Sequence, residues 1–559
     1  MDELSHAIAR LDARLESLER RILALEACAP RSNVVVLPVS SQPANAPHEF
    51  ALPQAGGFFP IAGKAMLGIA GAYLLRAVAE SGSFPMLAIA VLAMAYAAAW
   101  LVWAARTPGS LASTAYAATS ALILVPMLGE LTLRSQVLPA PATAALLSAF
   151  VSAALLLAWK RNLTSLVWIA EVATVFAALS LLILSHDLVP YTAALLVAAA
   201  VSEIAAATDR WRRLRFLVAP AADIAAAILI YIHSLPETSR PGYATVSNSV
   251  LLALPSALFF IYGASFAWRT IWRRRQTTFF EIAQSIITFT LALFTWLWFY
   301  PAAGRFGAGA FCWLLCAACY AAAFVVFDRI AEQRNYHVYA TYSAALLLAG
   351  SFLLLPSFYV ALFLTACSVV ATLVGLKVSR LTPEFHGLLY LTVAAYACGL
   401  LQYAGQALAG TFPTAPGWSV WIVAIAAVFC YAIGGRFAGE RWNERLLRLL
   451  AAILAVSAVA TFLVSCMVWL AAIGMTPGAS HVAVIRTLIT CGLSLALAAL
   501  GSRWKRNELV WTAYGTLALV SAKLLFEDLP HGHSGSIAIS ISLYALALIM
   551  VPRVARMGR

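Results

Sequence analysis

The sequence predicts an all-α, polytopic helical membrane protein with about 18 transmembrane helices in repeated hairpins and an N-terminal cytoplasmic coiled coil. Hydrophobic residues make up 62% of the 559 residues and charged residues 11%, whereas about a quarter of residues are charged in soluble domains. The apolar runs are long enough to cross a hydrocarbon core of roughly 30 Å. The turns between them alternate between basic and nearly uncharged, as expected for loops on opposite sides of a membrane.

Residues 1–28 carry the heptad pattern of a coiled coil. Apolar residues recur at alternating spacings of four and three, at Leu4, Ile8, Leu11, Leu15, Leu18, Ile22 and Leu25. Isoleucine at two a positions and leucine at every d position favours two strands. The pattern therefore predicts a homodimer or another protein partner, and the alternative is a lone amphipathic helix lying on the membrane or on the protein itself.

Residues 29–56 form the next predicted segment. Five prolines, interspersed with Ser, Asn and Gln, interrupt any helix there. Such a composition is typical of an extended tether.

The predicted transmembrane domain covers residues 57–552, and a basic cytoplasmic tail follows at 553–559. Its apolar runs lie at 58–79, 85–105, 110–133, 140–159, 163–185, 188–206, 214–234, 247–268, 279–299, 306–327, 336–355, 357–376, 384–408, 416–435, 446–472, 480–501, 508–526 and 536–551.

The cations predict the orientation of these runs. Turns that follow every second run are basic, from Arg106 through Lys160 and Arg161 to Arg503, Lys505 and Arg506. Short basic loops stay in the cytoplasm. Both termini are therefore predicted to be cytoplasmic, and the net charge of +13 is explained by topology rather than by a nucleic-acid partner.

Four carboxylates stand inside or at the end of apolar runs. Glu171 and Asp223 are the deepest, Glu281 enters its run near the cytoplasm together with Gln284, and Glu203 closes its run on that side. An ionisable group in the bilayer core costs at least about 2.5–3.5 kcal/mol on insertion scales, and many such groups are functional. The functional interpretation is a proton or cation relay or a polar substrate path. The alternative is a hydrogen-bonded carboxylate that fixes helix packing.

Charged residues also gather at the predicted exterior ends of the runs. The candidates for an anion site are Arg76, Glu130, Arg486, Lys523 and Asp528. Because the exterior side holds few other cations, Arg486 and Lys523 would suit a phosphate or carboxylate group. The spacing of four residues also predicts that Lys523 pairs with Glu527 along one helix face.

Several classes of protein find no support. The sequence contains no P-loop, Gly-rich dinucleotide turn, HExxH or G-x-S-x-G motif, so it predicts no cofactor and does not favour an enzyme. His531 and His533 lack a third metal ligand, so no metal site is predicted.

Short motifs near the two ends of the transmembrane region carry a resemblance to a known family. The first run holds Gly63-Lys64, Gly68, Gly71 and Tyr73-Leu74-Leu75-Arg76, and a late run ends in Ala522-Lys523-Leu524-Leu525-Phe526-Glu527-Asp528-Leu529. With the coiled coil and proline-rich segment before them, they resemble a bacterial family of multi-spanning membrane proteins, the domain-of-unknown-function 2339 group. Glu527 departs from that pattern, in which an apolar residue is expected before the Asp. The resemblance implies a bacterial inner-membrane protein and no particular activity.

Three functions are compatible with these features. The leading hypothesis is transport or flipping of an anionic, lipid-linked or cell-envelope molecule, motivated by the intramembrane carboxylates and the exterior cations. The second is a non-catalytic membrane scaffold or assembly factor that recruits partners through its coiled coil. The third is a membrane-embedded transferase. In each case the lipid bilayer is a partner, and for the first an anionic lipid or glycan is the expected ligand.

Overall fold

A computed structural model describes residues 55–80, 85–107, 110–159, 161–301, 303–327, 333–378, 381–409, 416–434, 442–474, 478–529 and 533–556. The chain forms two units, Met1–Gly63 and Lys64–Arg559. The predicted coiled coil, residues 1–28, and the tether up to residue 54 lie outside the described residues, so both stay predictions.

The regular elements of the described part are all helices. In chain order the α-helices are α2 (Ala55–Glu80), α3 (Met86–Arg106), α4 (Ser110–Gly129), α5 (Ala140–Trp159), α6 (Thr164–Ser185), α7 (Leu188–Ala207), α8 (Arg215–Ser234), α9 (Asn248–Ala267), α10 (Phe279–Phe299), α11 (Ala303–Ala321), α12 (Gln333–Leu354), α13 (Ser357–Val378), α14 (Leu381–Ala397), α15 (Leu400–Leu408), α16 (Trp418–Gly434), α17 (Trp442–Gly474), α18 (Ala479–Arg503), α19 (Asn507–Lys523) and α21 (Ser534–Arg556). Four π-helical turns extend them, η1 (Glu130–Arg134), η4 (Trp268–Trp272), η5 (Ala322–Phe327) and η6 (Leu524–Asp528), and two short 3₁₀ turns, η2 (Arg212–Leu214) and η3 (Glu237–Ser239), lie beside α8.

Fifteen helical spans of the described part are long and apolar enough to cross a membrane. The pair α14 and α15, bent by 64° at its break, would be a sixteenth, and α2 and α16 contain shorter apolar stretches, Pro60–Leu75 and Trp418–Ile433. Large apolar side chains such as Leu156 and Phe176 are exposed on these helices, as expected for surfaces that face lipid. The structure therefore confirms a helical multi-pass membrane protein, while the number of 18 spans stays a prediction.

Two predicted boundaries differ in the structure. The helix α2 begins at Ala55, inside the segment predicted as a tether, and α21 continues to Arg556, inside the predicted tail. Cations in the last turn of a helix interact favourably with its dipole, which is consistent with Arg553 and Arg556 being helical.

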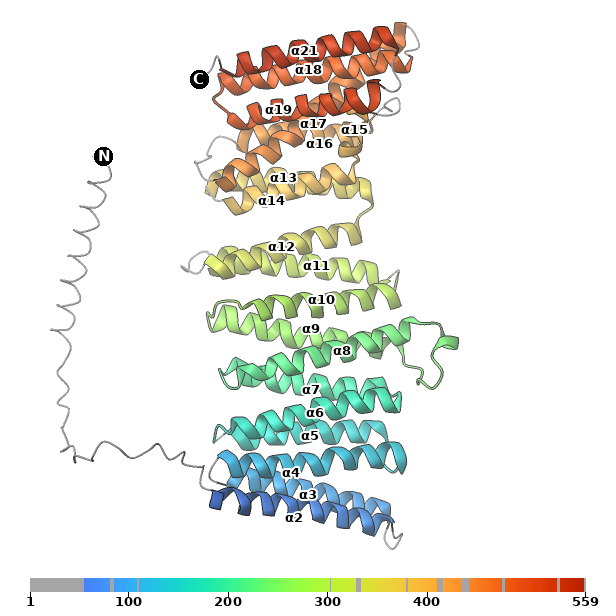
Figure 1. The fold of residues 1–559 in the computed structure, drawn as a ribbon, viewed down its shortest axis with the longest axis vertical. Coiled ribbons are helices and arrows are strands. Elements are labelled where there is room, and N and C mark those ends of the chain that lie inside the picture. Colours follow the sequence, from blue (N-terminus) through green and yellow to red (C-terminus); the bar gives the residue numbers. More distant parts are fainter. Residues whose placement is uncertain are drawn as a thin grey trace, which may run out of the picture. The chain divides into compact units, whose positions relative to one another are not determined.

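Within the unit Lys64–Arg559, helices pack mainly against those nearby in the chain (Figure 1). Among the described helices, substantial contacts join elements no more than four apart in this numbering, for example α4 with α6, α7 with α9 and α13 with α16. This is the contact pattern of a quasi-one-dimensional stack. A polar site in it is therefore built from neighbouring helices.

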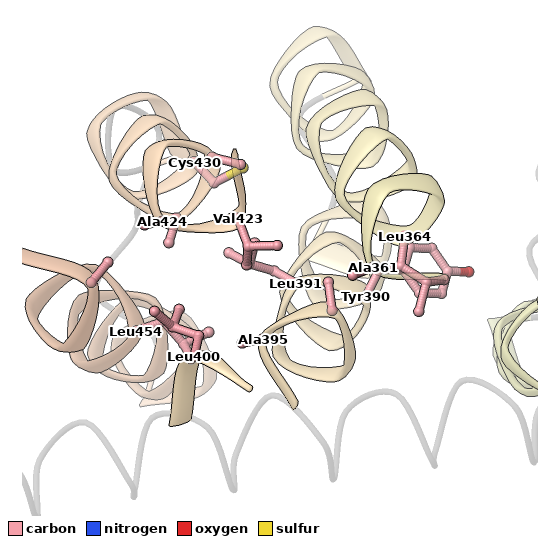
Figure 2. Close-up of a cluster of buried hydrophobic side chains, with 14 of the residues drawn as sticks. Ala361, Leu364, Tyr390, Leu391, Ala395, Leu400, Val423, Ala424, Cys430 and Leu454 are labelled. Atoms are coloured by element: carbon pink, nitrogen blue, oxygen red, sulfur yellow. The ribbon is translucent and has the colours of Figure 1, made fainter. Parts of the chain in front are cut away.

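One apolar core joins α13, α14, α15, α16 and α17 (Figure 2). Leu364, Leu391 and Val423 are fully or almost fully buried there. Between α14 and α15 the backbone turns at Gly399, whose φ of 81° lies in the left-handed region that favours glycine. The apolar run predicted at 384–408 is thus two helices, and Leu400, directly after the break, packs into the core.

Candidate functional site

The four intramembrane carboxylates singled out from the sequence all lie in one group of neighbouring helices. They are Glu171 on α6, Glu203 on α7, Asp223 on α8 and Glu281 on α10. Tyr262 of α9 is buried, and α9 packs against α7, α8 and α10. Residues from five consecutive helices thus form one polar region, which we call the α6–α10 region.

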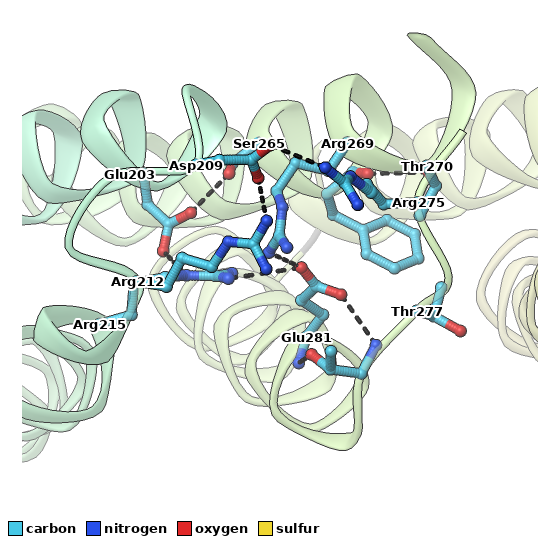
Figure 3. A network of polar contacts seen from close by, with 12 residues as sticks. Glu203, Asp209, Arg212, Arg215, Ser265, Arg269, Thr270, Arg275, Thr277 and Glu281 are labelled. Carbon is cyan, nitrogen blue, oxygen red and sulfur yellow. Dashed lines mark hydrogen bonds and ion pairs between the residues drawn. The ribbon is translucent and has the colours of Figure 1, made fainter. Parts of the chain in front are cut away.

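At one end of this region, Glu203 forms a buried ion pair. The Nε of Arg215 donates to Glu203 Oε1 at 2.6 Å, and the Ser265 hydroxyl donates to the other carboxylate oxygen (Figure 3). Arg215 stands at the first position of α8 and Ser265 near the end of α9. The pair therefore ties together the ends of α7, α8 and α9.

Glu281 completes this ion network. Its Oε1 accepts from Arg269 and, at 3.4 Å, from Arg215, while its Oε2 accepts from the backbone N–H of Thr278 at 2.9 Å (Figure 3). Thr278 in turn accepts from the Glu281 N–H, so the two residues form a capping box at the start of α10. Two arginines and two glutamates, all buried, therefore balance one another.

A second, exposed layer of charge lies beside the network. Arg212 donates to one oxygen of Asp209, and Arg275 donates to the other at 2.9 Å. The Arg212 hydrogen bond is the main cause that holds the pKa of the Asp209 carboxyl below its ordinary value of 3.8. Asp209 lies in the turn after α7, outside the membrane spans.

Asp223 lies deeper in the α6–α10 region than the network. It follows Arg215 by eight residues on α8, which is about 12 Å along the helix axis. The Nε2 of Gln284 donates to Asp223 at 2.9 Å from each carboxylate oxygen. Gln284 is three residues after Glu281, so the two side chains lie on one face of α10. On that face Glu281 joins the ion network and Gln284 binds Asp223.

Glu171 differs from the other three carboxylates. Its side chain is 0% exposed, and among the described residues neither carboxylate oxygen has a hydrogen-bond partner. Thr174, three residues further along α6, is also fully buried, and its hydroxyl likewise has no hydrogen-bond partner among the described residues. A buried polar group without a hydrogen-bond partner costs about 1–3 kcal/mol, and of the four acids only Glu171 carries this cost in the described structure.

The predicted exterior cations lie in a separate cluster on α18, α19 and η6. Arg486 is almost fully buried, and its Nη1 lies 3.2 Å from Glu527 Oε1. The Nζ of Lys523 donates to Asp528 Oδ1 at 2.8 Å and to the Thr487 hydroxyl at 3.0 Å. Each of the two cations thus already pairs with a carboxylate, so the cluster has no excess positive charge with which to bind a further anion.

The predicted pair between Lys523 and Glu527 is wrong in its partner, because Lys523 holds Asp528 and Glu527 holds Arg486. In an α-helix, residues five apart point about 140° away from each other. The turn from Leu524 to Asp528 is π-helical, and its wider winding brings residues five apart toward one face.

The remaining anion-site candidates do not join this cluster. Glu130 in η1 forms an exposed pair with Arg134 at 3.6 Å. The side chain of Arg76 on α2 lies outside the described part of the structure. Since neither α2 nor η1 makes a substantial contact with the described residues of α18 or α19, the five candidates do not form a single site.

Sequence reasoning missed several polar residues that the structure brings together. In the sequence, Arg215 and Arg269 served only as cations of the basic turns that predict the orientation. Each stands at an end of an apolar run, as do the acids with which they pair, Glu203 and Glu281. A further polar group joins α11 and α14, where the Tyr320 hydroxyl lies 3.0 Å from His386 Nδ1 and 2.6 Å from the Tyr390 hydroxyl. Isolated tyrosines in apolar runs gave no signal for this contact.

Among the residues that the structure describes, no group of three His, Cys, Asp or Glu side chains is placed to hold a metal ion. Comparison of the chain with protein-family models, curated proteins and solved structures finds no significant match in any of the three. The resemblance to the domain-of-unknown-function 2339 group therefore stays a prediction.

Proposed function

We propose that the protein is a membrane transporter in which the carboxylates of the α6–α10 region carry a proton or a small cation. The observation that supports this most strongly is Glu171, which is fully buried and has no hydrogen-bond partner among the described residues. Carboxylates that only fix packing are expected to be hydrogen-bonded. An intramembrane acid without a structural partner is typical of ion and proton pathways.

The neighbouring acids supply the comparison within the same protein. Glu203 and Glu281 are held by arginines, and Asp223 is held by Gln284. Their contacts suit residues that hold helices together. Glu171 has neither kind of partner in the described structure, so it is the residue we assign to ion or proton exchange.

The arrangement of the region supports a path toward Glu171. The ion network lies at the ends of α7–α10, Asp223 lies about 12 Å deeper along α8, and Tyr262 is buried on α9, which packs against α7, α8 and α10. We propose that the proton or cation enters at the network and passes Asp223 and Tyr262.

For the substrate we retain an anionic, lipid-linked or cell-envelope molecule as a proposal. Arg486 and Lys523 no longer support it, because Glu527 and Asp528 already neutralise them.

We also propose that the protein lies in the bacterial inner membrane with both termini in the cytoplasm, on the strength of the basic turns. Loss of fluorescence from a green fluorescent protein fused after Arg559 would contradict this orientation.

The proposal is tested by proton uptake into proteoliposomes that contain the purified protein, an internal pH-sensitive dye and an imposed inside-negative potential. We expect uptake by the wild type and at least a tenfold lower rate with Glu171→Gln, which keeps the shape of the side chain. Glu237→Gln, in the loop between α8 and α9, is the matched control and should behave as wild type. Equal uptake by the wild type and Glu171→Gln would refute the proposal.

The second candidate function is a membrane scaffold, and the chain-order packing of the helices favours it. A quasi-one-dimensional stack offers extended surfaces for partners, and the predicted coiled coil would add a cytoplasmic attachment point. This function predicts that deleting residues 1–28 removes partners recovered after cross-linking in membranes, whereas Glu171→Gln leaves them unchanged. No observation favours the third hypothesis, a membrane-embedded transferase.

A further inference from the structure

A long apolar groove lies between α16, α17, α18 and α19, away from the α6–α10 region. Its volume is about 980 Å³, at the upper end of the roughly 300–1,000 Å³ of small-molecule sites. Small residues form much of its wall, including Ala452 and Ala455 on α17 and Gly492 and Ala496 on α18. A side chain added at Gly492 would meet no neighbouring atom within 4 Å, so the space beside this residue is open.

The length of the groove matches the depth of one membrane leaflet. Along α18 the lining extends from Leu488 to Leu500, a rise of twelve steps or about 18 Å. Half of a hydrocarbon core of roughly 30 Å is about 15 Å. Leu488, Leu500 and the lining residue Trp504 are themselves exposed, so the groove is open at its side toward the surrounding lipid.

One end of the groove is basic. Arg506 lines it, with the guanidinium 5.3 Å from the centre of the Tyr431 ring. Arg503 is the last residue of α18, and Lys505 follows it in the turn before α19. Within the described ranges, none of these three cations has a carboxylate in ion-pair range, whereas the neighbouring Arg448 lies 3.9 Å from Glu508. The turn therefore carries positive charge that the described acids do not neutralise, unlike Arg486 and Lys523.

We propose that this groove binds an anionic phospholipid, with an acyl chain along α18 and the phosphate at Arg506. An apolar channel of leaflet length, open at its side and basic at the interface, is complementary to such a molecule. Basic pockets between transmembrane helices are recognised sites for anionic headgroups, and an arginine binds phosphate with directed hydrogen bonds. Trp504 lies at the same level, where tryptophan favours the membrane interface. The binding site is independent of the transport proposed for the α6–α10 region.

The test uses the full-length protein in nanodiscs and phosphatidylglycerol with a diazirine on its acyl chain. After irradiation, peptide mass spectrometry locates the attached lipid. We expect label on the groove face of α17 and α18 in the wild type, and at least fivefold less with phosphatidylcholine that carries the same chains. Arg506→Gln should remove this preference for the anionic headgroup, whereas Arg503→Gln, at the end of α18 but not lining the groove, should retain it.

A second pair of variants tests the groove itself. Gly492→Leu should fill it and reduce labelling by both lipids at least tenfold. Gly515→Leu on α19, where an added side chain also meets no atom within 4 Å, is the matched control and should label as wild type. Equal labelling by the two lipids, unchanged labelling of Gly492→Leu, or labelling that appears only after residues 1–54 are deleted would overturn the proposal. The last result would mean that the chain's own N-terminal segment occupies the groove.

Discussion

The α6–α10 region and the cluster on α18, α19 and η6 both contain buried acids on apolar helices, but the two differ in whether every acid has a partner. In the cluster, Glu527 and Asp528 each face a cation of the same helix group. In the α6–α10 region, Glu203 and Glu281 are paired in the same way, whereas Glu171 has no hydrogen-bond partner in the described part. A buried acid therefore identifies a candidate site only after its partners are known.

The largest loss of stability is expected where a pair is broken on one side only. Lys523→Ala leaves Asp528 buried without its cation and should lower the free energy of unfolding by about 3–5 kcal/mol. Arg553→Ala, at an exposed position of α21, is the control. Replacing both partners, Lys523→Met with Asp528→Leu, should recover most of the loss. The free energies are measured by unfolding in mixed micelles, and equal losses in the single and double variants would contradict the pairing.

A smaller loss is expected in the ion network, because it contains a second cation. Arg215→Ala leaves Arg269 to hold Glu281, and Glu203 loses its arginine but keeps the hydrogen bond from the Ser265 hydroxyl. We expect a decrease of about 2 kcal/mol in the free energy of unfolding. Arg213→Ala, exposed and two residues earlier in the chain, should change it little. A loss as large as that of Lys523→Ala would show that Arg269 and Ser265 do not compensate.

The sequence was sufficient for the class of fold and for the positions of most helices. Apolar length and basic turns are local properties, so they can be read without knowing how helices pack. The four carboxylates could also be identified as unusual, because each stands within or at the end of an apolar run.

The partners could not be predicted in the same way. Glu203 and Arg215 lie on successive helices, but Glu281 is 66 residues from Arg215, and only packing shows that they meet. The pairing of Lys523 with Asp528 depends on a π-helical turn, which the residue spacing does not reveal. The placement of Glu171 and Asp223 in one group of helices likewise requires the order in which α6 and α8 pack.

A change at Glu171 should affect stability less than either variant above. Glu171→Gln keeps the shape of the side chain and removes no hydrogen bond of the described structure. We expect the free energy of unfolding to change by less than about 1 kcal/mol, measured in the same mixed micelles. A loss near that of Lys523→Ala would indicate a structural partner for Glu171 and would remove the contrast between the two regions.

The smallest effect is expected at the exposed Asp209. Because hydrogen bonding to Arg212 lowers the pKa of this carboxyl in the folded protein, its stabilisation is present above the ordinary value of 3.8 and is lost as the pH falls through the lower folded value. Asp209→Asn should therefore cost less than about 1 kcal/mol at neutral pH. Thermal unfolding of the wild type and variant should converge at strongly acidic pH, and a difference that grows there would contradict this sign.

The most direct test of the central claim is labelling of membranes with dicyclohexylcarbodiimide, an apolar reagent that reacts with carboxyl groups inside the bilayer. Peptide mass spectrometry then identifies the modified acids, and proton uptake is measured on the same samples. We predict an adduct on Glu171 and none on Glu203 or Glu281, with uptake falling as the Glu171 adduct accumulates. An unmodified Glu171, or a modified Glu171 with unchanged uptake, would contradict the assignment of ion or proton exchange to the α6–α10 region.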